Sequence, residues 1–180
     1  MKSKWPGINA KGSVLIDLPY ESFHLSENPV VIDGFFFAAK DELHVTLAGE
    51  KVSTILQNKI AQDPKNSEVI EHIFDDIDWS FSRSGPIHIL SRLNKKRTLQ
   101  KTVIMLIDMP GVTTFYQRLK KPGLIPEVTP IPPAHVTLYT YNCPLGIGVP
   151  SNKVLASLSD KTFTVEQFDG ILNDTLTATD

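Results

Sequence analysis

The tetrapeptide His-Val-Thr-Leu stands at residues 44–47 and again at residues 135–138. Apolar and polar residues alternate around both copies, over residues 42–48 and 134–141, which is typical of half-buried strands. We therefore predict that each copy lies on a β-strand. The copies divide the chain into comparable halves, which favours a structural relation between them over an accidental repeat.

The alternation of side chains along a strand gives this repeat a chemical meaning. His44 and Thr46 share one face of their strand, and the apolar residues of the motif share the other face. His135 and Thr137 are related in the same way. Each copy therefore buries an apolar face and presents an imidazole and a hydroxyl on the opposite face. If the two strands meet, these four polar groups converge.

Two imidazoles and two hydroxyls suit the cleavage of a phosphodiester. The attacking oxygen must lose a proton and the leaving oxygen must gain one, and histidine does either near neutral pH. Each such transfer is typically worth about 10²–10⁴ in rate, and threonine hydroxyls can donate to the non-bridging oxygens. We predict His44, His135, Thr46 and Thr137 as catalytic residues, with no metal or other cofactor. The sequence leaves open which histidine is the acid.

Paired His-x-Thr motifs, each followed by an apolar residue and separated by about half a chain, resemble those of the two-histidine (2H) phosphoesterase superfamily, also called LigT-like. The resemblance implies an α+β fold with a bilobal pseudo-twofold duplication, in which two mostly antiparallel sheets form a central cleft with helices packed outside. It also implies a phosphodiesterase acting on a 2′,3′-cyclic phosphate, an RNA end, or a 2′-5′ or cyclic oligonucleotide. The expected partner is a nucleotide or a short RNA or oligonucleotide substrate.

The rest of the chain predicts one α+β domain over residues 1–180, whose lobes do not fold independently. Helical spacing of apolar residues follows Gly49 and Ser67, and shorter helices follow Pro110 and Ser151. The polar tail 173–180 is expected to fray. The predicted strands cover residues 14–16, 30–39, 42–48, 86–93, 99–108, 134–141 and 162–165.

The composition of the chain limits the classes of protein to which it can belong. The chain has 180 residues, a net charge of −2 and 41% hydrophobic residues, as in globular domains. No segment resembles a membrane span or a secretory signal, and the single Cys143 suits a reducing compartment. We expect a cytoplasmic protein with no membrane partner and no obligate protein partner. The absence of a strong positive charge favours a nucleotide or a short single-stranded end over a long nucleic acid.

Two further residues are candidates for substrate binding. Tyr139 lies four residues beyond His135 and could stack on a base, or it could equally cover the sheet. Arg83, in the polar segment 82–85, could neutralise phosphate or be a solvated loop residue. Gly146-Ile147-Gly148 could offer backbone amides to an anion, although turn geometry explains these glycines as well.

Two alternative functions compete with catalysis by paired histidines. A zinc site needs four close ligands or a compact pair such as His-Glu-x-x-His, and the sequence contains neither pattern. A non-catalytic module on the same fold would bind RNA ends or a nucleotide without turning them over. The complete threonines in both motifs favour catalysis.

Overall fold

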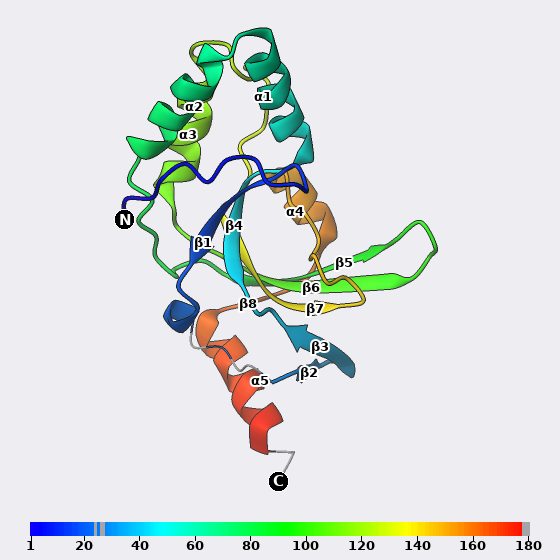
Figure 1. The fold of residues 1–180 in the computed structure, drawn as a ribbon. Helices are drawn as coiled ribbons and strands as arrows, with labels where there is room; N and C mark the ends of the chain where they lie inside the picture. Colours follow the sequence, from blue (N-terminus) through cyan, green and yellow to red (C-terminus); the bar gives the residue numbers. More distant parts are fainter. Residues whose placement is uncertain (24, 26–27, 178–180) are drawn as a thin grey trace.

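The chain forms an antiparallel sheet with helices packed around it (Figure 1). The computed structural model describes residues 1–23, 25 and 28–177. None of the described helices is long and apolar enough to cross a membrane. The strands are β1 (Val14–Leu18), β2 (Val30–Ile32), β3 (Phe35–Ala39), β4 (Leu43–Ala48), β5 (Ile87–Leu93), β6 (Leu99–Leu106), β7 (His135–Tyr141) and β8 (Ser159–Phe163). The helices are the 3-10 helix η1 (Tyr20–Phe23), α1 (Glu50–Gln62), α2 (Lys65–Asp75), α3 (Pro110–Lys120), α4 (Asn152–Leu158) and α5 (Val165–Thr177).

The strands of the described residues form one connected eight-stranded sheet. Its order is β1-β4-β7-β6-β5-β8, while β3 pairs with both β2 and β7. The predicted α+β class and the antiparallel pairing are confirmed. The strands do not separate into the two sheets that the resemblance implies, because β4 and β7 pair directly at Val45 and Val136. The internal duplication stays a prediction.

Two segments differ from the sequence prediction. The single strand expected over 30–39 is the hairpin of β2 and β3, because Asp33 and Gly34 both have positive φ, 52° and 77°, and form a two-residue turn. The strand expected over 162–165 is β8, which ends at Phe163 and is followed by α5. Of the predicted fraying tail, residues 173–177 belong to α5 and residues 178–180 lie outside the described part.

Two apolar clusters lie on opposite faces of the central strands. The larger cluster contains Val45 and Val136 of the motifs and side chains of α1, α2 and α3. The smaller cluster joins Ile104 of β6 to α4 and the loop before it. Val103 and Met105, the neighbours of Ile104 along β6, belong to the larger cluster, and successive residues of a strand point to opposite faces. The helices α1–α3 therefore cover one face, and α4 partly covers the other.

Candidate active site

The two motif strands are neighbours in the sheet. β4 and β7 pair antiparallel at Val45 and Val136. Continuing this register by one residue in each direction sets His44 across from Thr137, and Thr46 across from His135. The two histidines are then diagonal neighbours, a relation that typically separates residues by about 7–8 Å. The predicted catalytic residues thus occupy adjacent positions at the centre of the sheet.

Burial separates the two faces of each motif as the alternation predicted. Val45, Leu47, Val136 and Leu138 are at most 1% exposed and belong to the larger core. His44, Thr46 and Thr137 are half-buried, and His135 is 7% exposed. His135 pairs with Leu106 and Thr137 pairs with Ile104, which places the polar face of β7 on the side of α4.

The leucine of each motif lies at an irregularity in its strand. Between β1 and β4 the register passes from Leu15–Thr46 to Val14–Ala48 and omits Leu47. Between β6 and β7 it passes from Ile104–Thr137 to Val103–Tyr139 and omits Leu138. An additional residue of this kind is a β-bulge, which bends the strand and shifts its side-chain alternation. The two motifs therefore share a local backbone feature as well as a sequence.

His135 has a defined proton arrangement. Its Nδ1 lies 2.8 Å from the carbonyl oxygen of Pro133. A carbonyl oxygen can only accept, so Nδ1 carries the proton and Nε2 carries the lone pair. Burial lowers the pKa of His135; the Pro133 hydrogen bond opposes this change, and the charge of His44 adds to it. Burial therefore favours the neutral ring, in which Nε2 carries the lone pair.

His44 lies in a more polar environment than His135. It pairs across β1 with Asp17, whereas the corresponding partner of His135 is Leu106. Burial is the main cause that lowers the pKa of His44, and the ammonium of Lys40 adds to it. The carboxylates of Asp17 and Glu42 act in the opposite direction and favour the protonated ring.

A loop after β7 lies against Thr137. A Cβ on Gly146 would stand 3.1 Å from Oγ1 of Thr137, and Gly146 has a φ of +78°. The loop is fixed because the amide of Ile147 donates to Oγ1 of Thr102 at 3.1 Å and Nζ of Lys40 donates to the carbonyl of Pro144 at 3.1 Å. The Ile147 amide is thus used within the protein, which supports the turn explanation of Gly146-Ile147-Gly148 over the anion site.

Tyr139 is not part of the polar face, contrary to the sequence prediction. The bulge at Leu138 pairs Tyr139 with Val103 of the larger core. Its ring has no exposed surface and lies 6.1 Å from the ring of Phe168 in α5. A fully buried ring offers no face to a base, so we withdraw Tyr139 from the predicted site.

Arg83 also has a structural explanation. Its Nη1 donates to the carbonyl oxygen of Ser22 at 2.8 Å, and its guanidinium lies 5.5 Å from the ring centroid of Phe23. These contacts attach the segment before β5 to η1. No contact within the described part of the chain brings Arg83 to the four motif residues, so its role as a phosphate ligand stays a prediction.

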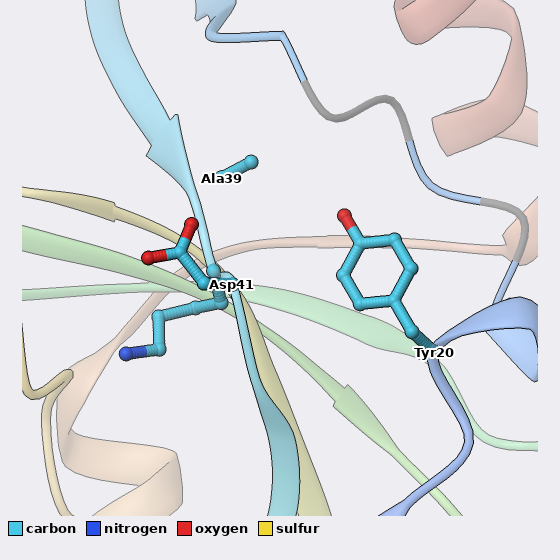
Figure 2. A pocket seen from close by; sticks show the side chains of 4 residues that line it. Tyr20, Ala39 and Asp41 are labelled. Carbon is cyan, nitrogen blue, oxygen red and sulfur yellow. The ribbon is translucent and has the colours of Figure 1, made fainter.

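A cavity of about 340 Å³ lies beside the first motif strand. It is lined by Tyr20, Ala39, Lys40 and Asp41, from η1 and the turn between β3 and β4 (Figure 2). These residues form no sequence motif, and they come together only through the pairing of β1 with β4. A second cavity, of about 330 Å³, lies between the ends of α2 and α3, near Asp78 and Arg118.

Among the described residues, no group of three or more His, Cys, Asp or Glu side chains could hold a metal ion. No protein-family model matches the chain. No curated protein and no solved structure matches it either.

Proposed function

We propose that this protein is a metal-independent phosphodiesterase of the 2H type, which cleaves a nucleotide or RNA-end phosphodiester. The substrates would be 2′,3′-cyclic phosphates or 2′-5′ or cyclic oligonucleotides. One observation carries the proposal: β4 and β7 pair antiparallel at Val45 and Val136. Continued by one residue in each direction, this register would set each motif histidine across from the threonine of the other motif. A phosphate over this group of side chains would meet two imidazoles and two hydroxyls.

The different surroundings of the histidines assign their roles in this proposal. His135 is the general base, because its Nδ1–H is engaged with Pro133 and its Nε2 is left with a lone pair. His44 is the general acid, because it is less buried than His135 and because the carboxylates of Asp17 and Glu42 oppose the lowering of its pKa by burial and by Lys40. Environments that make one histidine a better base and the other a better acid are the usual signature of such a pair.

In this proposal a 2′,3′-cyclic phosphate is hydrolysed by a single displacement at phosphorus, in which water replaces a ribose oxygen. Nε2 of His135 takes a proton from water while the water oxygen forms a bond to phosphorus. The bond between phosphorus and one ribose oxygen breaks, and His44 donates its proton to that oxygen. The hydroxyls of Thr46 and Thr137 donate to the non-bridging oxygens as their charge changes. The product is a phosphomonoester, and proton exchange with solvent deprotonates His135 and reprotonates His44.

The implied duplication is part of the same proposal. The bulges at Leu47 and Leu138 follow their histidines by the same number of residues, and β1 and β6 are the outer partners of the two motif strands. Matching irregularities in two segments support descent of both motifs from one repeated unit. The central cleft that the resemblance to 2H phosphoesterases implies would then correspond to the polar face over β4 and β7.

The proposal is tested with a panel of 2′,3′-cyclic nucleotides, linear 2′-5′ oligomers and cyclic dinucleotides, assayed by chromatography with and without EDTA. We expect turnover of at least one class that persists in EDTA. His44→Ala and His135→Ala should each reduce turnover at least about a hundredfold. His72→Ala, on the exposed surface of α2, is the matched control and should retain full activity.

Two outcomes would contradict this assignment. Full activity in the double variant His44→Ala, His135→Ala would show that the pair is not catalytic. Tight binding of a panel member without turnover would identify the protein as the non-catalytic nucleotide-binding module instead.

A further inference from the structure

The side chain of Lys40 lies on the same face of the sheet as the polar residues of the motifs. Lys40 directly follows Ala39, which pairs with Tyr139 of β7, and both of these side chains contact the larger core. Successive side chains of a strand point to opposite faces, so Lys40 points to the polar face. Its Nζ accordingly donates to the carbonyl oxygen of Pro144 at 3.1 Å, in the loop before α4 that belongs to the smaller cluster on that face.

The backbone of Lys40 is held beside Thr137. The amide of Lys40 donates to the carbonyl oxygen of Leu138, the residue after Thr137, at 3.0 Å. The register of β4 and β7, continued by one residue, would set His44 across from Thr137. β3 and β4 both pair with the edge of β7 that β6 leaves free. Lys40 and His44 therefore approach the same stretch of β7 from the same edge, and the ammonium lowers the pKa of the His44 ring.

The ammonium of Lys40 has no carboxylate partner within the described part of the chain, where it forms no salt bridge. Lys40 is half-buried, and the Pro144 carbonyl accepts one of its three N–H donors. Removing a cation from water is unfavourable unless an anion or hydrogen bonds replace the lost hydration. Lys101, which is also partly buried, shows this pairing, because its Nζ lies 2.7 Å from a carboxylate oxygen of Asp160. Lys40 is therefore suited to an anionic ligand.

A phosphate over the motif residues needs a positive charge of this kind. The threonine hydroxyls are neutral, and burial favours the neutral form of His135. The carboxylates of Asp17 and Glu42, which raise the pKa of His44, would repel the phosphate. The ammonium of lysine is a common point charge in phosphate sites. Lys40 can offset the repulsion without taking part in proton transfer.

We propose that Lys40 is a substrate-binding residue, whose ammonium donates to a non-bridging oxygen of the scissile phosphate while the Pro144 carbonyl holds it in position. The proposal rests on the proposed function. Substrate and product both carry this phosphate, so Lys40 stabilises both complexes. Its removal should therefore raise KM and weaken product binding more than it lowers kcat.

The first experiment measures phosphate binding without turnover. The full chain is titrated calorimetrically with the 3′-monophosphates of adenosine, guanosine, cytidine and uridine, and with the four nucleosides. Lys40→Gln, which retains a side-chain donor, should weaken binding of the monophosphates about tenfold, the loss typical of one hydrogen bond to a charged group. It should leave binding of the nucleosides unchanged. Lys40→Arg should retain most of the affinity, because the positive charge remains.

The second experiment separates binding from the effect of Lys40 on His44. For each 2′,3′-cyclic monophosphate that is cleaved, kcat and KM are measured at the pH optimum of each variant. Lys40→Gln should raise KM about tenfold with a smaller change in kcat. If Lys40 acted only through the protonation of His44, the pH profile would move while KM at the optimum and the affinity for monophosphates stayed the same.

Lys11→Gln is the matched control for loss of one positive charge near the same histidine. Lys11 is exposed before β1, and its charge also lowers the pKa of His44. Because an exposed charge is screened by solvent, this variant should weaken binding of the monophosphates by less than about twofold. Thermal unfolding of each variant would verify that it is folded.

The outcomes separate the role of Lys40 from the proposed function. Unchanged affinity for the monophosphates in Lys40→Gln, or equal losses in Lys40→Gln and Lys11→Gln, would overturn the role of Lys40 and leave the phosphodiesterase proposal standing. Binding of the monophosphates that depends on Lys40, without turnover of any cyclic phosphate, would support the phosphate contact and reject catalysis. If the unaltered protein binds none of the monophosphates, the proposed contact is wrong.

Discussion

The two motif histidines share their neighbours along the chain and differ in their neighbours in space. His44 pairs with the charged Asp17, and His135 pairs with the apolar Leu106. Burial is the largest cause that lowers both pKa values, and His135 is the more buried ring. Burial therefore favours the neutral form of both rings, and a charge on His44 further disfavours protonation of His135.

The pH dependence of activity follows from these directions. The proposed reaction would need neutral His135 and protonated His44, and burial lowers the pKa of both rings from the usual 6.5. Protonated His44 is lost as the pH rises through its lowered pKa, and neutral His135 is lost as the pH falls through its own. We expect a bell-shaped profile of kcat/KM with its maximum below about pH 6.5, measured as initial rates from pH 4 to 9.

Two charge variants test whether the pKa of His44 sets the alkaline limb of the pH profile. Lys40→Gln removes a charge that lowers the pKa of His44, so the alkaline limb should move to higher pH. Asp17→Asn removes a charge that raises this pKa, so the same limb should move to lower pH. A limb that does not move in either variant would reject His44 as the acid.

At the scale of elements, the loop after β7 determines the surroundings of Thr137. Gly146 has a positive φ, and a Cβ there would stand 3.1 Å from Oγ1 and 3.3 Å from Cγ2 of Thr137, a tight contact that needs a shift of a few tenths of an ångström. A side chain there must either displace Thr137 or move the loop. The glycine is therefore required by the geometry of the site as well as by the turn.

We expect Gly146→Ala to lower kcat through displacement of Thr137 and to cost about 1–2 kcal/mol of stability from the positive φ. Gly148→Ala is the matched control, because no atom outside its chain neighbours lies within 4 Å of its Cβ position and its φ is not in the strained range. Steady-state kinetics and urea unfolding of both variants would measure these effects. Equal kinetics for the two variants would show that Gly146 does not position Thr137.

At the scale of the whole molecule, α5 completes the larger core. Phe168 is 1% exposed and packs against Tyr139 of β7 and Phe163 of β8. The helix begins with a reciprocal cap, in which the amide of Gln167 donates to Oγ1 of Thr164 and the amide of Thr164 donates to Oε1 of Gln167. This capping box is visible in the sequence as Thr-x-x-Gln and would have predicted the helix.

The packing of α5 predicts the effect of removing one ring. Phe168→Ala should destabilise the protein by about 3–5 kcal/mol, as for other buried aromatic residues. Phe36→Ala is the matched control, since Phe36 is 69% exposed on β3, and it should change stability by less than about 0.5 kcal/mol. Denaturant unfolding would measure both. A small effect of Phe168→Ala would contradict the buried position of this helix.

Local patterns in the sequence were sufficient to predict both motif strands, the burial of Val45 and Val136, and the polar face of His44 and His135. These features depend on side-chain alternation within a few residues, which the chain encodes directly. The Asp-Gly signal of the turn at residues 33–34 is equally local, but the apolar residues on both sides of it favour one continuous strand.

The sequence of this protein alone therefore determined two equivalent strands and the chemistry that they carry. It did not determine that the strands pair with each other in one sheet, that Tyr139 enters the core, or that Tyr20, Lys40 and Asp41 line one cavity. These features depend on the register between strands distant in sequence and on bulges at Leu47 and Leu138. Register is selected by packing of the complete core, so it exists only once the whole chain has folded.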